Sequence, residues 1–377
     1  MIKHTLQYCA TDKEIFDALM SAKQKINEKI LLELAKDRGL IYSNKSTREE
    51  LIDAISLLPH DYNDLNTLLE QREHTGRQEK LTSVTLPAAL TKEEIKEVIK
   101  EYIEESPDDE KTTHYTKSSG QLIVNVKYSD IDYGKTRLVQ RTPKEAAIEF
   151  HVEANKTVIR MPANDRIQKV FGKIKDKLDG KRKTEIPAVR IELGEFESGL
   201  RTEFFTSLIT TLDGFSLKNV TSVKVERLKN EQDEDDLFLE DDQEAEEAKQ
   251  EALAMVKKVA LKGDTLLLSD EYQSLAIKGF FITSIIWRSR LNTVLQPMIE
   301  FEAAFEDPEK GKGFKYFVRG SYNFINNEYT KTIRPVEPED KEKYLTLIEA
   351  TATKIIEKLR KKVEMEHTSE ALESCDE

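Results

Sequence analysis

Apolar side chains recur at the helical period over most of the first 110 residues, which predicts a helical N-terminal module over 1–110. Helices are expected at 14–30, 28–37, 46–58, 60–85 and 91–105. The second of them ends at Gly39, because glycine readily takes the left-handed conformation that closes a helix. The polar stretch 111–120 that follows the module is expected to be a linker.

From residue 121 onward apolar positions alternate with polar ones, which is typical of β-strands. Strands are expected at 122–126, 137–139, 147–152, 157–160, 188–193, 216–228 and 279–288, and helices at 164–178, 198–212 and 269–278. Residues 297–306 and 314–324 are expected to form a hairpin, and a last amphipathic helix is expected over 339–363. The body over 121–365 is therefore predicted to be α+β, with packed helices on a mixed, mainly antiparallel sheet.

Two acidic segments account for the formal net charge of −13. Residues 231–247 hold eleven acidic residues and no basic one, and 366–377 hold five more acids. The rest of the chain has a net charge of +3, which leaves room for a basic surface. The first segment lies in an expected insertion over 229–250, either a solvated loop or an imitation of a nucleic-acid backbone. The second segment is expected to be a disordered tail.

Length and composition narrow the class of protein. With 377 residues the chain is long enough for two or three domains. No apolar run approaches the length that crosses a bilayer, and the first residues lack the pattern of a signal peptide. A cytoplasmic protein with no membrane partner is therefore expected. Cys9 and Cys375 are the two cysteines, which excludes a zinc ribbon and a disulfide framework.

The segment 27–57 combines an apolar helix, a break at Gly39-Leu40, a short extended piece and a second helix. Ser46 and Glu49 have the spacing of a capping box, in which the two side chains satisfy free backbone N–H groups at the start of a helix. This arrangement resembles the SAP and related helix–extension–helix DNA-binding modules, with an extended piece slightly longer than typical.

The resemblance implies a DNA contact at the N-terminus of the second helix. Free N–H groups at such an end favour phosphate, and Lys45, Arg48 and Arg38 would supply positive charge. Phosphate contacts position a protein without reading sequence, so double-stranded DNA bound with low specificity is expected. The alternative is an ordinary two-helix element, which the acidic residues of the second helix favour.

A second candidate surface is the hairpin strand around Lys315. Lys315, Phe317 and Arg319 share one face of the strand, and Tyr316 adds another aromatic ring. Aromatic and cationic side chains together can stack on bases and neutralise phosphates. A third basic cluster, near the turn at Pro143, comprises Arg137, Arg141 and Lys144. For both clusters the alternative is ordinary packing or surface charge.

The sequence contains no motif of a phosphate-binding loop or of a dinucleotide-binding fold. It also lacks the nucleophile elbow of serine hydrolases and the zinc-binding motif of metalloproteases. No cofactor and no metal site is therefore expected. The nearest approach to a metal nuclease is Glu149, His151, Glu153 and Lys156, with Glu192, Glu195 and Glu197 further on. Glu153 and Lys156 are one residue too far apart for the usual nuclease spacing.

These observations favour a protein that binds nucleic acid without catalysis, as one component of a larger complex. A prokaryotic DNA-processing or phage-defence system would suit such a component. The first alternative is an adaptor that binds only protein through its helices and acidic segment. The second is a degenerate metal-dependent nuclease.

Overall fold

The computed structural model describes residues 10–23, 26–61, 63–64, 79–107, 109–117, 120–134, 140–227, 258–262, 279–293, 296–326 and 328–373. They group into two compact units. The first comprises the residues up to 79 with 92–149 and 171–178, and the second comprises 80–91, 150–170 and 179 onward. The fold class is α+β with a mainly antiparallel sheet, as predicted. None of the helices in the described ranges is long and apolar enough to cross a membrane.

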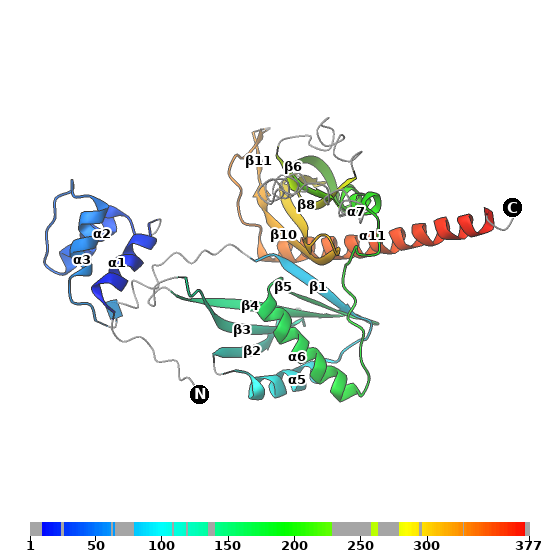
Figure 1. The fold of residues 1–377 in the computed structure, drawn as a ribbon, viewed down its shortest axis with the longest axis horizontal. Helices are drawn as coiled ribbons and strands as arrows, with labels where there is room; N and C mark the ends of the chain where they lie inside the picture. The colour runs from blue at the N-terminus through cyan, green and yellow to red at the C-terminus, as the bar shows by residue number, and fades with distance from the viewer. Residues whose placement is uncertain are drawn as a thin grey trace, which may run out of the picture. The chain divides into compact units, whose positions relative to one another are not determined.

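Three short helices of the first unit form a helical module with its own core (blue in Figure 1). They are α1 (Asp12–Ser21), α2 (Glu28–Asp37) and α3 (Arg48–Ser56). Leu19, Leu31 and Ile52 are fully buried in this core. The expected helix over 14–30 is therefore wrong beyond Ser21. The side chain of Asn27 accepts a hydrogen bond from the backbone N–H of Ile30 and so begins a new helix there.

The rest of the first unit contains α5 (Lys92–Glu105) and the neighbouring strands β2 (Glu110–Thr116), β3 (Leu122–Ile131) and β4 (Arg141–Val152). The expected linker over 111–120 is wrong, because most of it is β2, which pairs antiparallel with β3. Its polar residues are held in place from within the unit. Glu110 is buried and accepts hydrogen bonds from the hydroxyls of Tyr102 and Thr112.

The second unit is built on a sheet in the order β5-β1-β10-β9-β8-β6-β7. Its strands are β1 (Leu81–Leu86), β5 (Thr157–Pro162), β6 (Phe215–Arg227), β7 (Lys258–Lys262), β8 (Phe280–Leu291), β9 (Met298–Asp307) and β10 (Lys312–Tyr322). The expected hairpin is confirmed, because β9 and β10 pair antiparallel from Asp307↔Lys312 onward. The expectation of a helix over 60–85 is wrong at its C-terminal end, because the chain from Leu81 onward forms strand β1.

Helices α7 (Ser198–Thr210) and α11 (Pro338–Glu373) belong to the second unit, and α6 (Asp165–Arg182) contributes to both units. A small separate hairpin, β11 (Phe324–Ile325) with β12 (Glu328–Tyr329), follows β10. Of the strand expected over 188–193, Val189 forms an isolated bridge with Thr85. Helix α11 runs on to Glu373, so the tail expected from residue 366 is helical over most of its length.

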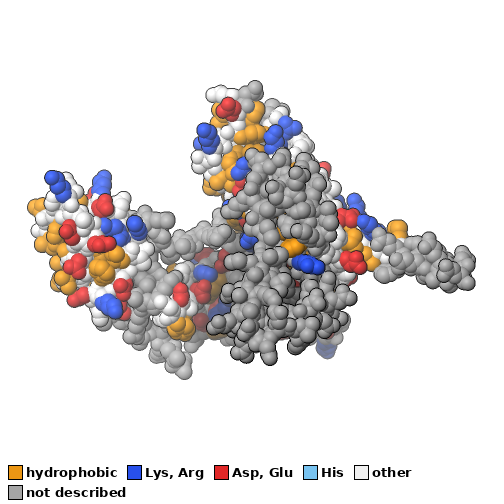
Figure 2. All heavy atoms as spheres, turned by 45° about the horizontal axis from the view of Figure 1, so that its top comes forward, with side chains coloured by type: hydrophobic (Ala, Val, Ile, Leu, Met, Phe, Trp, Pro, Cys, Tyr) orange, Lys and Arg blue, Asp and Glu red, His pale blue; other side chains and the backbone are white. Residues whose placement is uncertain are grey.

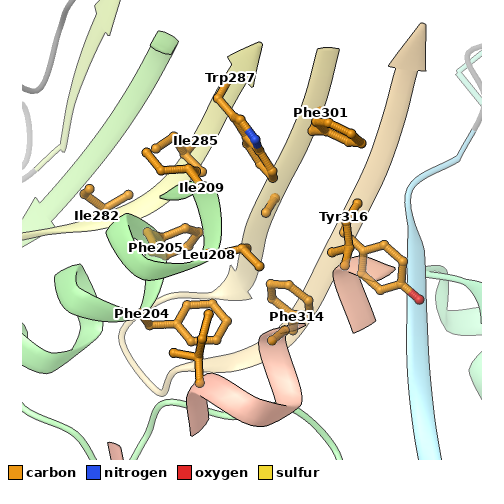
Figure 3. Packing of buried hydrophobic residues seen from close by; sticks show 14 of the residues in the cluster. Phe204, Phe205, Leu208, Ile209, Ile282, Ile285, Trp287, Phe301, Phe314 and Tyr316 are labelled. Carbon is orange, nitrogen blue, oxygen red and sulfur yellow. The ribbon is translucent and has the colours of Figure 1, made fainter. Parts of the chain in front are cut away.

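The core of the second unit lies between the sheet and the two helices α7 and α11. Figure 3 shows Phe204, Phe205 and Leu208 of α7 pointing toward rings and branched side chains of the sheet. Trp287 of β8 stacks on Phe301 of β9 with ring centroids 5.3 Å apart. The core residues of β9 and β10 occupy alternate positions of each strand. The opposite face of these two strands therefore carries the polar side chains.

Several expectations fall outside the described residues. They are the strand at 137–139, the acidic insertion at 229–250, the helix at 269–278 and residues 65–78 of the helix expected over 60–85.

Candidate nucleic-acid interface

The start of α3, where the sequence places a phosphate site, is closed by its own cap. The cap is Thr47 with Glu50, one residue later than the expected pair of Ser46 and Glu49. The backbone N–H of Thr47 donates to Glu50 Oε2 at 2.9 Å, and the N–H of Glu50 donates back to Thr47 Oγ1. Glu49 and Glu50 both lie in the first turn, where their charge opposes an incoming phosphate. The helix end itself is therefore a poor anion site.

Arg48, expected as an exposed cation, is turned into the module. Its Nη2 donates to the carbonyl oxygen of Leu19 at 2.6 Å, and its Nε donates to the carbonyl oxygen of Ile26 at 3.4 Å. These carbonyls lie at the end of α1 and just before α2, so the guanidinium ties three helices together. The expectation that this side chain is exposed is wrong, because the last carbonyls of a helix need donors.

Arg38 has a similar place at the end of α2. Its Nη1 donates to the carbonyl oxygen of Leu34, and its Nη2 lies 3.0 Å from Asp64 Oδ1. The same Nη2 lies 3.3 Å from Nδ1 of His60. His60 Nε2 is 2.9 Å from the carbonyl oxygen of Ile55 and so must carry the ring proton, which leaves Nδ1 to accept from Arg38. Arg38 thus fixes the end of α2 to the segment that follows α3.

The two arginines hold the two ends of the extended segment 39–47, which we call the extension. Gly39 opens it with φ of +77°. Leu40 and Tyr42 are partly buried against the module core, whereas Ile41 between them is 92% exposed. Lys45 is exposed, and no ion pair or side-chain hydrogen bond of it is found within the described residues. The extension therefore presents one isoleucine and one lysine on a fixed support.

The module as a whole is not basic. Between residues 10 and 64 the sequence has eight basic and eleven acidic residues. Figure 2 shows positive, negative and hydrophobic side chains intermixed on the visible face of this module. Any attraction for phosphate therefore comes from the local arrangement of side chains and is not a property of the module's net charge.

The second candidate surface, on β10, is partly as predicted. Lys315, Phe317 and Arg319 do share the polar face of the strand. Tyr316 lies on the opposite face and is fully buried, so its proposed contact with nucleic acid is wrong. The alternation that puts Lys315 and Arg319 outward turns Tyr316 inward, where its hydroxyl donates to Glu349 of α11.

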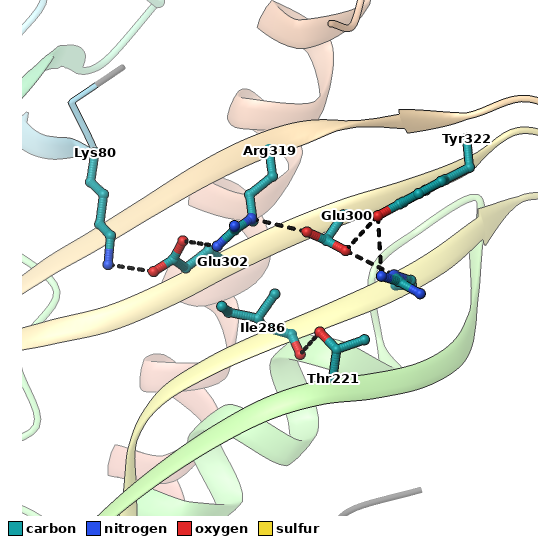
Figure 4. Close-up of polar contacts among 8 residues, drawn as sticks. Lys80, Thr221, Ile286, Glu300, Glu302, Arg319 and Tyr322 are labelled. Carbon is teal, nitrogen blue, oxygen red and sulfur yellow. Dashed lines mark hydrogen bonds and ion pairs between the residues drawn. The ribbon is translucent and has the colours of Figure 1, made fainter. Parts of the chain in front are cut away.

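The cations of this polar face are paired with carboxylates. Arg319 Nε lies 2.9 Å from Glu300 Oε1, and its Nη1 lies 3.0 Å from Glu302 Oε2. Figure 4 shows the row continuing to Lys80 at one end and to Tyr322 at the other. Lys315 is 3.9 Å from Glu306, a looser pair. Because each cation is balanced within the sheet, this row attracts phosphate weakly.

At the end of this row Arg288 Nε donates to Glu300 Oε2 at 2.8 Å, and Arg288 Nη2 contacts the hydroxyl oxygen of Tyr322. Burial lowers the pKa of Arg288, but the hydrogen bond and charge of Glu300 outweigh burial and leave the pKa above its ordinary value. Burial and the charge of Glu300 raise the pKa of Tyr322. Both groups therefore keep their protons, and the row is a stable structural network.

Of the third cluster, the structure describes only the side chain of Lys144. Arg137 lies outside the described residues, and so does the side chain of Arg141, whose backbone begins β4. Lys144 is bonded to Asp130 at 3.0 Å and to Glu79 at 3.3 Å. Burial lowers the pKa of Lys144, but these two carboxylates outweigh burial and raise it. Lys144 therefore has carboxylate partners and does not present a free charge.

Three of the nuclease-like carboxylates lie in separate ion pairs. Glu153 pairs with Lys156 at 3.4 Å, Glu149 with Lys117 at 3.8 Å, and Glu195 with Arg360 at 2.7 Å. Within the described ranges no three histidine, cysteine or acidic side chains are placed to hold a metal ion.

Comparison with known proteins gives no family: no model of a protein family matches the chain, and no curated protein matches it. The geometry of the module brings Arg38, Arg48 and Lys45 together around the extension. The exposure of Ile41 has no signal in the sequence, because its neighbours Leu40 and Tyr42 are also apolar and partly buried.

Proposed function

We propose that this chain binds double-stranded nucleic acid through the extension of its helical module, with low sequence specificity and without catalysis. It would act as one component of a larger cytoplasmic complex. The proposal keeps the module that the sequence singled out and moves the contact from the start of α3 to the extension.

One observation carries the proposal. Arg38 and Arg48, at the two ends of the extension, are both bonded inside the module, while Lys45 and Ile41 between them point into solvent. A loop that is fixed before binding loses little conformational entropy when it binds. Ile41 is 92% exposed, so a contact with another molecule would remove its apolar surface from water.

The chemistry of the contact follows from the residue types. The ammonium group of Lys45 would neutralise one phosphate and release its counterions. Ile41 offers an apolar surface to sugar or base edges, and the hydroxyls of Ser43 and Ser46 are donors for phosphate oxygens. None of these groups reads a base edge through a pair of hydrogen bonds, so low specificity is expected.

The test is fluorescence anisotropy with a labelled duplex of mixed sequence, a single strand of the same sequence and a duplex RNA at low salt. We expect the intact chain to prefer duplex, and Lys45→Ala to weaken binding about fivefold with no change in thermal stability. Ile41→Ser should weaken binding without a change in net charge. Intact chain that leaves all three probes unbound would refute the proposal.

A second function, docking to a protein only, is favoured by a specific observation. The module has more acidic than basic residues, and Leu57 is also exposed, at 64%, at the end of α3. Two exposed aliphatic side chains on an acidic surface suit a basic protein partner. Leu57→Ser separates the two functions, because it should leave duplex affinity unchanged and reduce protein docking.

A further inference from the structure

The second unit carries a two-stranded hairpin formed by residues 321–326 and 328–334, which we call the finger (beside the β11 label in Figure 1). Ser321 and Arg334 pair at its base through two backbone hydrogen bonds of 2.8 and 2.9 Å. Phe324 faces Tyr329 and Ile325 faces Glu328 further out. The finger is thus a ribbon of paired backbone that rises from the end of β10.

The finger is fixed in its direction by three contacts. The N–H of Thr330 donates to the carbonyl oxygen of Asn323 at 3.0 Å. The hydroxyl of Tyr329 donates to the carbonyl oxygen of Gln296, in the loop between β8 and β9. At the base, Gly320 lies so close to the returning chain that a Cβ there would be 2.5 Å from the carbonyl oxygen of Arg334. A side chain at residue 320 would therefore displace the base.

Apolar side chains are exposed on this fixed ribbon. Ile325 is 52% exposed next to the turn, and Phe324 and Ile333 are each 37% exposed. Asn326 takes the left-handed conformation with φ of +51°, as tight hairpin turns require. None of these three side chains belongs to the hydrophobic core of this unit, so their apolar surface is available to another molecule.

Positive side chains surround the base of the finger. Lys331 and Arg334 are exposed on the ribbon itself, and Arg290 is exposed at the end of β8. Arg290 lies in the same row of the sheet as Tyr322, with Met298 between them. Unlike Arg319 and Arg288, none of the three cations has a carboxylate or other side-chain partner within the described residues. Glu328 is the acidic residue of the ribbon.

We infer that the finger enters a groove of double-stranded nucleic acid, with Ile325 as an apolar wedge and Arg290, Lys331 and Arg334 on the flanking phosphates. A two-stranded ribbon fits the width of a duplex groove, and aliphatic wedges that partly unstack a base step bend the duplex. The inference rests on the proposed function, since it names a second contact with the same partner. A protein partner would use the apolar end without needing the three cations.

The experiment uses the full chain and two readouts on one 24-base-pair duplex: anisotropy for affinity at several salt concentrations, and energy transfer between dyes at the duplex ends for bending. The variants are Lys331→Ala with Arg334→Ala, and Ile325→Ala. The matched control is Lys354→Ala with Lys358→Ala on α11, which removes the same charge from two exposed lysines. Circular dichroism confirms that each variant is folded.

We expect the finger double variant to bind about tenfold more weakly and to lower the log–log salt slope by about two. Ile325→Ala should leave the salt slope unchanged and abolish the rise in energy transfer. Glu328→Gln should strengthen binding. If the intact chain binds the duplex and the finger variants match the α11 control, the finger is not a contact with the duplex and the inference is wrong. If the intact chain does not bind at all, the proposed function itself has failed.

Discussion

Arg48 donates a 2.6 Å hydrogen bond from Nη2 to the carbonyl oxygen of Leu19. An arginine that opens one helix therefore closes the end of another, twenty-nine residues earlier in the chain. The bond places positive charge at a helix C-terminus, where the backbone dipole favours it. Arg48, for which a phosphate contact was expected, instead supports the extension from within the module.

The role of Arg48 predicts a separation between stability and binding. Arg48→Ala removes donors from two backbone carbonyls and should destabilise the helical module by about 1–3 kcal/mol. Lys45→Ala should leave the module's stability unchanged, because the side chain is exposed. Hydrogen exchange at the backbone amides of α3 measures the stability of the module in both variants. Equal protection in the two variants would show that Arg48 does not hold the helices.

A buried ion pair in the second unit gives a second prediction. Arg160 of β5 is 2% exposed and contacts Glu349 of α11 through Nε at 2.6 Å and Nη2 at 2.9 Å. Glu349→Leu should cost about 3–5 kcal/mol, since it leaves a buried guanidinium without its partner. Arg160→Met combined with Glu349→Leu should recover most of that loss. Chemical denaturation of the two variants provides the measurement, and a double variant as unstable as the single one would contradict it.

Tyr316 links this pair to pH. Burial, followed by the nearby charge of Glu349, raises the pKa of its hydroxyl well above the ordinary value. A raised folded-state pKa means that the unfolded chain loses this proton first, so the contribution is full below about pH 10 and declines above it. The unfolding free energy of the intact chain should therefore fall more steeply between about pH 9 and 11 than that of Tyr316→Phe. Parallel curves for the two proteins would rule out this coupling.

Gly311, in the turn between β9 and β10, and Gly214, between α7 and β6, give a matched pair of glycine substitutions. A Cβ at Gly311 would lie 2.5 Å from the backbone of Leu193 and Gly194, and its φ is +62°. A Cβ at Gly214, with φ of +73°, would meet nothing within 4 Å. Gly214→Ala should therefore cost about 1 kcal/mol from backbone strain alone, and Gly311→Ala clearly more. The melting temperatures of the two variants provide the comparison. Equal decreases in melting temperature would show that the short distance between Gly311 and the backbone of Leu193 and Gly194 does not affect stability.

Elements with a strong local period were predictable from the sequence. Helix α5 has its apolar residues at helical spacing, and the hairpin of β9 and β10 alternates around a glycine-containing turn. The strand expected over 279–288 is β8, and its signal in the sequence is a run of apolar residues; the helix expected over 198–212 is α7. In each case neighbouring residues along the chain decide the structure.

Elements whose partners are distant in sequence were not predictable. Strand β2 is rich in threonine and charge, and its place in the sheet depends on pairing with β3. Arg160 and Glu349 are 189 positions apart, so no local pattern connects them. For the candidate site, the sequence identified the region around Lys45 but not which cations are free, because Arg38, Arg48 and Arg319 find their partners only in the fold.

In the proposed function the extension contacts phosphate through Lys45. The most direct test is the duplex affinity of the intact chain, Lys45→Ala and Lys354→Ala, measured from about 25 to 200 mM salt. Counterion release predicts that Lys45→Ala lowers the log–log slope by about 0.9 and weakens binding most at low salt, whereas Lys354→Ala follows the intact chain. Identical slopes for the intact chain and Lys45→Ala would contradict the claim.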